Sequence, residues 1–179
     1  HIPEENLVFW LSGHNERADE RTSNLIYDDA ISVSGLPDQL TTSHIDVTQY
    51  VPNPAPGVYE LKLKSGSASD TTRLLMTDIN LVAKMPRALE GKSWGNEVKV
   101  WALDMHTGAR QGNVFIDAIR PSGAIMGSCQ TRSDGSCTIG LPEEDVDTTP
   151  PMALVAKSGS DHTYLKFSEL KTPTSEFRV

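Results

Sequence analysis

The two cysteines are the residues with the clearest capacity for covalent chemistry. Cys129 and Cys137 flank the segment QTRSDGS, in which Asp134-Gly135 is a common hairpin turn. Positions equally distant from a turn oppose one another on a hairpin, and 129 and 137 are such a pair about Ser133. The spacing predicts a disulfide, with two free thiols as the alternative. Closing so short a loop contributes about 2.5 kcal/mol, and the bond indicates an oxidising periplasmic or extracellular location.

The histidines give no comparable signal for a metal site. They stand in separate segments, and none has a second histidine or a cysteine at the spacing of metal ligands. The five are His1, His14, His44, His106 and His162. We expect them to be surface or structural residues. The acidic run 142–149 lacks the DxDxDG pattern of a calcium loop, so we interpret it as a solvated loop, with weak calcium binding as the alternative.

The sequence lacks the motifs of the common catalytic and nucleotide sites. It holds no GxSxG nucleophile turn, no GxGxxG and no GxxxxGK[ST]. Ser, His and Asp are all present, but no pattern joins them. We therefore expect neither an enzyme nor a bound cofactor.

Composition narrows the range of partners. Lys and Arg number 16 against 24 Asp and Glu, which gives a net charge of −8, and the basic residues are scattered. Nucleic acid is therefore not an expected partner. No apolar run approaches the roughly 18 residues that span a bilayer. The chain begins without a methionine or a signal pattern, which indicates a piece of a longer protein.

Alternating apolar residues predict an all-β protein of antiparallel sandwiches, immunoglobulin-like or fibronectin-III-like. The apolar runs have period two, and turn-forming residues separate them at short intervals. From Asp78 onward, seven runs predict one complete sandwich over residues 78–179. These runs are NLVAK, EVKVWALD, NVFIDAIR, AIMGSCQT, SCTIGL, MALVAK and HTYLKF.

Residues 1–77 are predicted to form a second sandwich, trimmed or irregular. The five runs expected to be its strands are LVFWL, LIYDDAISVSG, SHIDVTQ, VYELKLK and TRLLMTD. Almost no helix is expected, because neither ENLVFWL nor MPRALEGKSW sustains a long helical stripe. The two domains abut near residues 77–83 without a Gly/Ser or Pro linker, so we expect a fixed orientation between them.

The run NVFIDAI is apolar on both of its faces. Val114, Ile116 and Ala118 point one way, whereas Phe115 and Ile119 point the other. We expect this outer row, with Trp101 on a neighbouring strand, to contact the first domain or parts of the longer protein. Scattered surface apolar residues are the alternative.

The order of these motifs resembles the bacterial α2-macroglobulins. The segment TGARQGNVFIDAIRPSGAIMGSCQTRSDGSCTI is similar to their TGxPVxGAxV strand followed by a TDxxG hairpin. Upstream, PGVYELKL and LLMTDINLVAK resemble the end of one macroglobulin-like domain and the start of the next. Downstream, HTYLKFSELKTPTSEF resembles a last strand and its exit. The likeness covers residues 45–177 and departs from the family pattern at 109–111 and at 132–133.

The resemblance implies a broad-range protease trap in the bacterial periplasm, anchored to the inner membrane through a lipid outside this chain. Cleavage of a bait segment would trigger a rearrangement that confines the protease. The CxEQ thioester motif of some members is missing here, and no bait region is evident. The chain would then be a pair of macroglobulin-like domains, the second and third. Its partners would be the other macroglobulin-like domains and, through the whole protein, target proteases.

Two other classes of function stay open at this point. A stalk of a surface adhesin or cell-wall-binding protein uses similar sandwiches as spacers. A carbohydrate-binding sandwich needs a platform of exposed aromatic residues, for which Trp10, Trp94 and Trp101 are available. The doubly apolar run at 113–119 favours a compact assembly over a linear stalk.

Overall fold

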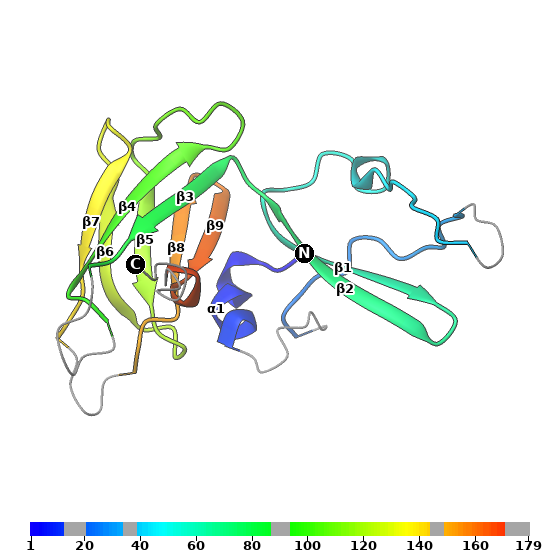
Figure 1. Cartoon of the computed structure of the whole chain (residues 1–179), viewed down its shortest axis with the longest axis horizontal. Coiled ribbons are helices and arrows are strands. Elements are labelled where there is room, and N and C mark those ends of the chain that lie inside the picture. The colour runs from blue at the N-terminus through cyan, green and yellow to red at the C-terminus, as the bar shows by residue number, and fades with distance from the viewer. Residues whose placement is uncertain (13–20, 34–38, 87–93, 144–148, 171–179) are drawn as a thin grey trace, which may run out of the picture.

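The chain folds mainly into strands, as the computed structural model shows (Figure 1). It describes residues 1–12, 21–33, 39–86, 94–143 and 149–170. His14, most of the acidic run 142–149 and the exit segment after Leu170 therefore lie outside the described residues. In chain order the elements are α1 (Glu4–Ser12), η1 (Val47–Gln49), β1 (Gly57–Ser65), β2 (Ala68–Met76), β3 (Ile79–Lys84), β4 (Glu97–Asp104), β5 (Phe115–Ile119), β6 (Ile125–Gln130), β7 (Ser136–Gly140), β8 (Ala153–Ser158), β9 (Asp161–Lys166) and η2 (Phe167–Leu170).

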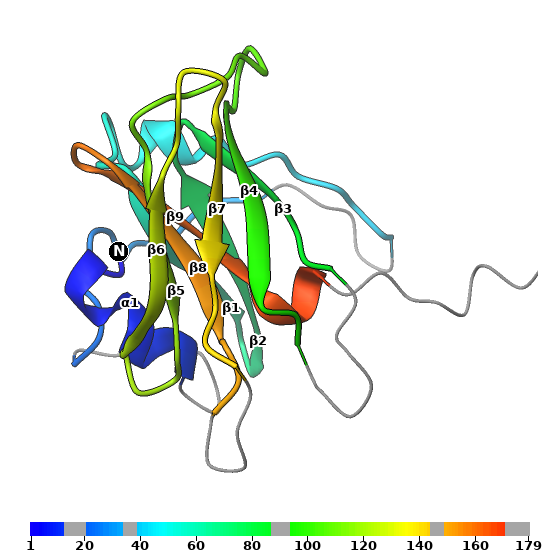
Figure 2. The same ribbon diagram turned by 90° about the vertical axis from the view of Figure 1, so that its left-hand side faces the viewer.

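Strands β3 to β9 form a two-layered antiparallel sandwich (Figure 2). One sheet has the order β3-β4-β7 and the other β6-β5-β8-β9. Each of the seven runs predicted from Asp78 onward forms one of these strands, which confirms the all-β sandwich fold. The division of the chain into domains at residue 77 stays a prediction.

The core of the sandwich follows from strict alternation along its strands. On β4, Val98, Val100 and Ala102 are fully buried, while the intervening Glu97 and Lys99 are exposed. The opposite sheet contributes inward side chains with the same period, because successive side chains of a strand point to opposite faces. Its buried members are Val114, Ile116, Ala118, Leu154 and Ala156.

The prediction that LVFWL forms the first strand of the N-terminal part is wrong, because these residues lie in helix α1. Leu7, Trp10 and Leu11 are the buried residues of this helix, and their i, i+3, i+4 spacing places them on one helical face. Glu4 and Glu5 occupy the first turn, where negative charge interacts favourably with the helix dipole. Tertiary packing of this face stabilises a helix of only nine residues.

The remaining N-terminal elements form less sheet than the sequence predicts. Of the five expected strands, only those within VYELKLK and TRLLMTD are present in the described residues, as the antiparallel hairpin β1–β2. SHIDVTQ instead ends in the 3-10 turn η1, where the Asp46 carboxylate accepts a hydrogen bond of 3.0 Å from the backbone N–H of Thr48. The hairpin lies to the side of the sandwich, beyond α1 and β9, and points away from it (Figure 1).

Helix α1 covers the outer face of the sheet that contains β5 and β8. A second apolar cluster joins Leu7, Trp10 and Leu11 to Ile119, Ala153 and Val155 of that sheet, and to Ile2 and Val58 at the start of the hairpin. The Trp10 ring packs edge-on against Tyr164 of β9, with 6.1 Å between centroids. On the hairpin side, the Arg73 guanidinium lies 4.9 Å from the centroid of the same ring. Trp10 thus contacts both the sandwich and the hairpin.

Replacing Trp10 with alanine should destabilise the chain by about 3–5 kcal/mol, because a fully buried indole leaves a cavity. Phe9→Ala is the matched control, since the neighbouring Phe9 side chain is 64% exposed. Urea unfolding of both variants measures the difference. If Trp10→Ala and Phe9→Ala have the same midpoint as the wild type, α1 does not hold the N-terminal part on the sandwich.

Candidate functional site

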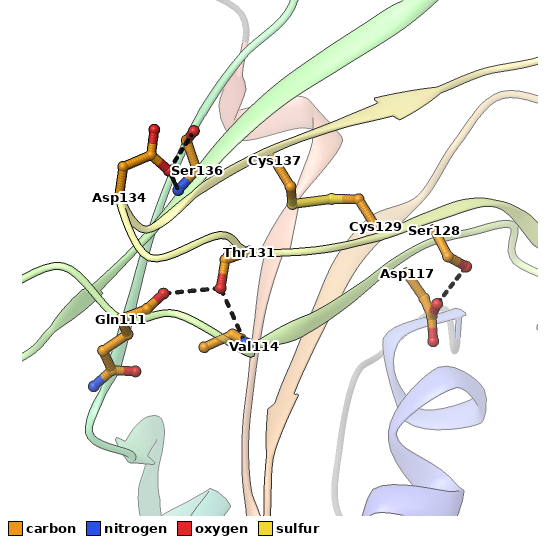
Figure 3. The surroundings of a disulfide bond; sticks show 9 residues. All are labelled: Gln111, Val114, Asp117, Ser128, Cys129, Thr131, Asp134, Ser136 and Cys137. Carbon is orange, nitrogen blue, oxygen red and sulfur yellow. Dashed lines mark hydrogen bonds between the residues drawn. A yellow bond between two sulfur atoms is a disulfide. The ribbon is translucent and has the colours of Figure 1, made fainter.

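The predicted disulfide is present between Cys129 of β6 and Cys137 of β7, with the Cα atoms 6.0 Å apart (Figure 3). The two strands are consecutive in the chain but are edge strands of different sheets. The bond therefore joins the two layers of the sandwich where both sheets end. It is a link between sheets and not a link between paired strands of one sheet.

The turn between β6 and β7 is held by side chains as well as by backbone. The Asp134 carboxylate accepts hydrogen bonds of 2.9 Å from the backbone N–H and from the hydroxyl of Ser136. Both hydrogen bonds hold the pKa of Asp134 below its usual range, and the bond from the backbone N–H has the larger effect. Gly135 has φ 73°, the left-handed conformation that such a turn requires.

A buried threonine connects this turn to the preceding loop. The hydroxyl of Thr131, 3% exposed, donates to the carbonyl of Gln111 at 2.8 Å and accepts from the N–H of Val114 at 3.0 Å (Figure 3). Its buried polar atom is thus satisfied on both sides. These bonds fix the loop that leads into β5.

Close backbone approach accompanies the disulfide at the junction of β6 and β7. A Cβ built on Gly127 would overlap the carbonyl oxygen of Gly140 and would lie 2.8 Å from the Ile139 side chain. Only glycine therefore lets β6 pass this near to β7. At Gly140, by contrast, a Cβ would meet nothing within 4 Å.

The three residues predicted to make inter-domain contacts do not share one surface. Ile119 is 4% exposed and packs in the α1 cluster. Phe115 begins the same strand but is 58% exposed in this chain. Trp101 is on β4, in the other sheet, where it faces outward and the Lys99 ammonium lies 5.4 Å from its ring centroid. Contacts of Phe115 and Trp101 with other parts of a longer protein stay a prediction.

The tryptophans also do not form an aromatic platform. Trp10 and Trp94 are 2% and 6% exposed, and each belongs to a different apolar cluster. A stacking surface for sugars needs exposed rings side by side, so these residues do not support the carbohydrate-binding alternative.

A pocket of about 450 Å³ lies between the β1–β2 hairpin and residues 23–31 and 45–54. Three tyrosines line it, together with aliphatic side chains. Tyr27 and Tyr50 have ring centroids 5.2 Å apart, and the hydroxyl of Tyr59 donates to the carbonyl of Ala55 at 2.6 Å. Burial raises the pKa of Tyr59. The lining is mainly apolar, and its polar side chains besides the tyrosines are those of His1, Ser23, Asn24, Glu60 and Lys62.

Two histidines that the sequence left unconnected approach each other in space. His1 and His162 both lie against Gly57, although 160 residues separate them in the chain. No sequence spacing could signal this pair, because the contact depends on how the hairpin docks on β9. Groups of three or more potential metal ligands are absent from the described residues.

No helix within the described part of the chain is long and apolar enough to cross a membrane. The residues described above instead form apolar clusters, a disulfide and hydrogen-bonded turns. Taken together, they define a two-layered antiparallel β-sandwich with an N-terminal helix and hairpin packed on it.

The same architecture occurs in α2-macroglobulin of Escherichia coli. The crystal structure of the native protein spanning its domains NIE and MG1 matches with a TM-score of 0.72 at 15% identity, covering 93% of this chain and 80% of that one. The structure spanning MG0, NIE and MG1 matches with a TM-score of 0.70 at 16% identity, and 52% of it is covered. In the cryo-EM reconstruction of the native conformation, the match has a TM-score of 0.55 and covers 10% of that chain.

These matches establish the fold, and they point to the family that the sequence resembles. No family model matches the chain, and no curated protein matches it in sequence. The sequence predicts two macroglobulin-like domains, whereas the matched segment carries the domain names NIE and MG1. This chain is therefore similar to a segment of a much longer multidomain protein.

Removing the disulfide should lower the free energy of unfolding by about 2–3 kcal/mol, because the unfolded chain regains its loop entropy. We expect the double variant Cys129→Ala/Cys137→Ala to unfold at lower urea concentration than the oxidised wild type. In addition, denatured wild-type protein should take up no alkyl group without reductant. Uptake of two alkyl groups would show free thiols and contradict the bond.

Gly127→Ala should destabilise the sandwich by about 1–3 kcal/mol, since the added methyl group forces β6 away from β7. Gly140→Ala is the matched control on the facing strand and should stay within about 0.5 kcal/mol of the wild type. Urea unfolding again provides the comparison. Equal midpoints for the two variants would mean that the sheets do not meet as closely as described.

Proposed function

We propose that this chain is a structural segment of a bacterial α2-macroglobulin-like protease inhibitor, a trap that protects the cell from foreign proteases. The observation that carries the proposal is the match of 93% of the chain to E. coli α2-macroglobulin. The order of motifs in the sequence supports the same family. The segment itself has no bait region or thioester motif, so its part in the trap is mechanical.

The packing of the N-terminal part on the sandwich supports this mechanical role. A frame has to keep its shape while the cleaved bait and the parts attached to it move. The α1 cluster buries Trp10 between the sandwich and the hairpin, and the disulfide joins the two sheets at the opposite side of the fold. These contacts resist sliding of the two parts, because displaced apolar surface would be exposed to water.

The partners and the location of the parent protein follow from the same proposal. Its partners are the other macroglobulin-like domains of the same chain and, through the whole protein, the trapped proteases. The net charge of −8 with dispersed basic residues does not favour nucleic acid. The disulfide fits the oxidising periplasm. Attachment to the membrane would come from a lipid anchor outside this segment.

The full-length parent protein provides the direct test. Mixed with trypsin or elastase, it should suppress cleavage of a large protein substrate and leave cleavage of a small peptide substrate intact, because confinement excludes only large molecules. The 179-residue chain alone is the control and should change neither activity. If both activities persist while the parent is merely digested, the trap function is wrong for these proteases and a stalk becomes the better explanation.

A substitution in this segment tests its mechanical role within the full-length protein. Trp10→Ala should still be cleaved in its bait segment but should protect large substrates less, whereas Phe9→Ala should behave like the wild type. Gel electrophoresis follows bait cleavage, and the two substrates follow confinement. Unchanged protection by a folded Trp10→Ala protein would remove this segment from the mechanics of the trap.

A further inference from the structure

Strand β2 forms an open edge of the N-terminal hairpin. Its sheet has only two strands, so β2 pairs with β1 on one side and with no strand of the described residues on the other. The outer edge of β1 is used near its base, where the N–H of Ile2 donates to the carbonyl of Val58 at 2.8 Å. The hairpin points away from the sandwich (Figure 1), and the sheets of the sandwich do not extend to β2.

The register of the hairpin shows which backbone groups of β2 point outward. In an antiparallel pair, residues that bond across the ladder alternate with residues whose N–H and C=O point away from it. Val58 accepts its bond from Ile2 on the outer side of β1, so Val58 and the opposite Leu75 are of the outward kind. Every second residue repeats this orientation, which on β2 gives Ser69, Thr71, Arg73 and Leu75.

Two of these outward N–H groups have no bond within the described part of the chain. The N–H of Thr71 is bound by the Asp70 carboxylate at 2.8 Å. The N–H groups of Ser69 and Leu75, by contrast, have no partner outside the hairpin among the described residues. Ser69 is exposed and Leu75 is 44% exposed, so both groups are available to another strand.

This edge lacks most of the features that keep exposed strand edges from pairing. Strand β2 is nine residues long, and its register with β1 is regular from end to end without a bulge. Its sequence, ASDTTRLLM, contains no proline and no lysine. Natural edge strands are usually short, interrupted or charged, because an open row of N–H and C=O groups otherwise templates pairing with another chain. A long and regular edge of this kind is therefore expected to be covered in the complete protein.

One face of the hairpin beside this edge is apolar. Leu74 and Met76 of β2 line the pocket of about 450 Å³, together with Tyr59 and Leu61 of β1. A strand added along β2 would place every second side chain next to Leu74 and Met76, because opposite residues of paired strands share a face. Recognition by an open edge combines such side-chain contacts with backbone hydrogen bonds. The edge therefore fits an extended segment with apolar side chains at alternate positions.

The remainder of the parent chain is the occupant that the observations favour. This chain matches only 10% of the E. coli α2-macroglobulin chain in the native reconstruction, so a parent of that kind has most of its residues outside this segment. A segment of the same chain competes at an effective concentration of about millimolar. A second copy suits the edge less well, because pairing all nine residues of β2 with themselves puts the Asp70 carboxylate opposite Leu74.

We propose that the outer edge of β2 binds an extended strand from another domain of the same parent chain, which enlarges the hairpin to a three-stranded sheet. This proposal rests on the proposed function, which supplies the other domains. A hairpin alone is marginally stable, whereas three strands with an apolar face are stable. The base of the hairpin is held by α1 and β9, and the added strand would hold its exposed outer half. The hairpin would thus connect this segment to the rest of the trap.

Hydrogen exchange of β2, followed by mass spectrometry with residue-level fragmentation, tests the proposal without any substitution. The N–H groups of Ser69 and Leu75 should exchange at least about tenfold more slowly in the full-length parent than in the 179-residue chain. The N–H of Lys64, which points outward on the other edge of the hairpin, is the matched control and should exchange equally in both. Equal rates at Ser69 and Leu75, or the same slowing at Lys64, would overturn the proposal.

A proline on the open edge tests strand addition directly. Thr71→Pro removes an outward N–H and places a ring on the edge without removing a bond between β1 and β2. In the parent, this variant should restore fast exchange at Ser69 and Leu75, whereas Thr71→Ala should keep it slow. In the 179-residue chain, the two variants should melt within a few degrees of each other. Slow exchange that persists in the Thr71→Pro parent would contradict a strand at this edge.

Photo-cross-linking identifies the occupant. In the parent, Leu75→benzoylphenylalanine should form a cross-link within one chain to a residue beyond this segment. Met105→benzoylphenylalanine is the control, because Met105 is similarly exposed, at 47%, but follows β4 in the sandwich. A cross-link between two copies, or none at Leu75, would overturn the proposed occupant. No protease is used in these measurements, so failure of the trap function and failure of this docking are detected separately.

Discussion

The arrangement of the whole chain depends on burying both faces of one sheet. Strands β5 and β8 turn one row of apolar side chains into the sandwich core and a second row, with Ile119, Ala153 and Val155, away from it. An antiparallel sheet normally leaves this second face to water. Here α1 covers it, and at about 25 cal/mol per Å² of apolar surface removed from water, this contact is a main source of the stability of the N-terminal part.

The consequence is that the N-terminal part cannot be understood as an independent sandwich. A two-stranded hairpin is marginally stable in water, and most of β2 and the outer half of β1 are exposed. Its base is fixed by Val58, by the bridge from Ile2 and by the stacking of Arg73 on Trp10. The hairpin is thus ordered at the end that touches α1 and β9, where the His1 and His162 rings also meet.

The sequence predicted those features that depend on local patterns. Period-two alternation located all seven strands of the sandwich. The spacing about Ser133 predicted the correct disulfide, but the expected pairing of its two strands is wrong, because β6 and β7 belong to different sheets. The helix was missed because LVFWL is apolar at nearly every position, although Leu7, Trp10 and Leu11 have helical spacing. The outward row of NVFIDAI was recognised, but the sequence could not show that Trp101 belongs to the other sheet. Strand order is set by non-local pairing, which leaves no trace in a short window of residues.

Contacts between segments that are far apart in the chain could not be predicted from the sequence. The pocket brings residues 23–31 and 45–54 against the hairpin, and the contact of His1 and His162 with Gly57 brings the first residue of the chain next to β9. The pocket and the contact between the histidines both depend on how the hairpin docks on the sandwich. No periodicity in the sequence encodes that docking. The disulfide and Gly127 hold the far edge of the sandwich independently of this docking. A change at the hairpin base would therefore alter the attachment of the N-terminal part while leaving the sandwich closed.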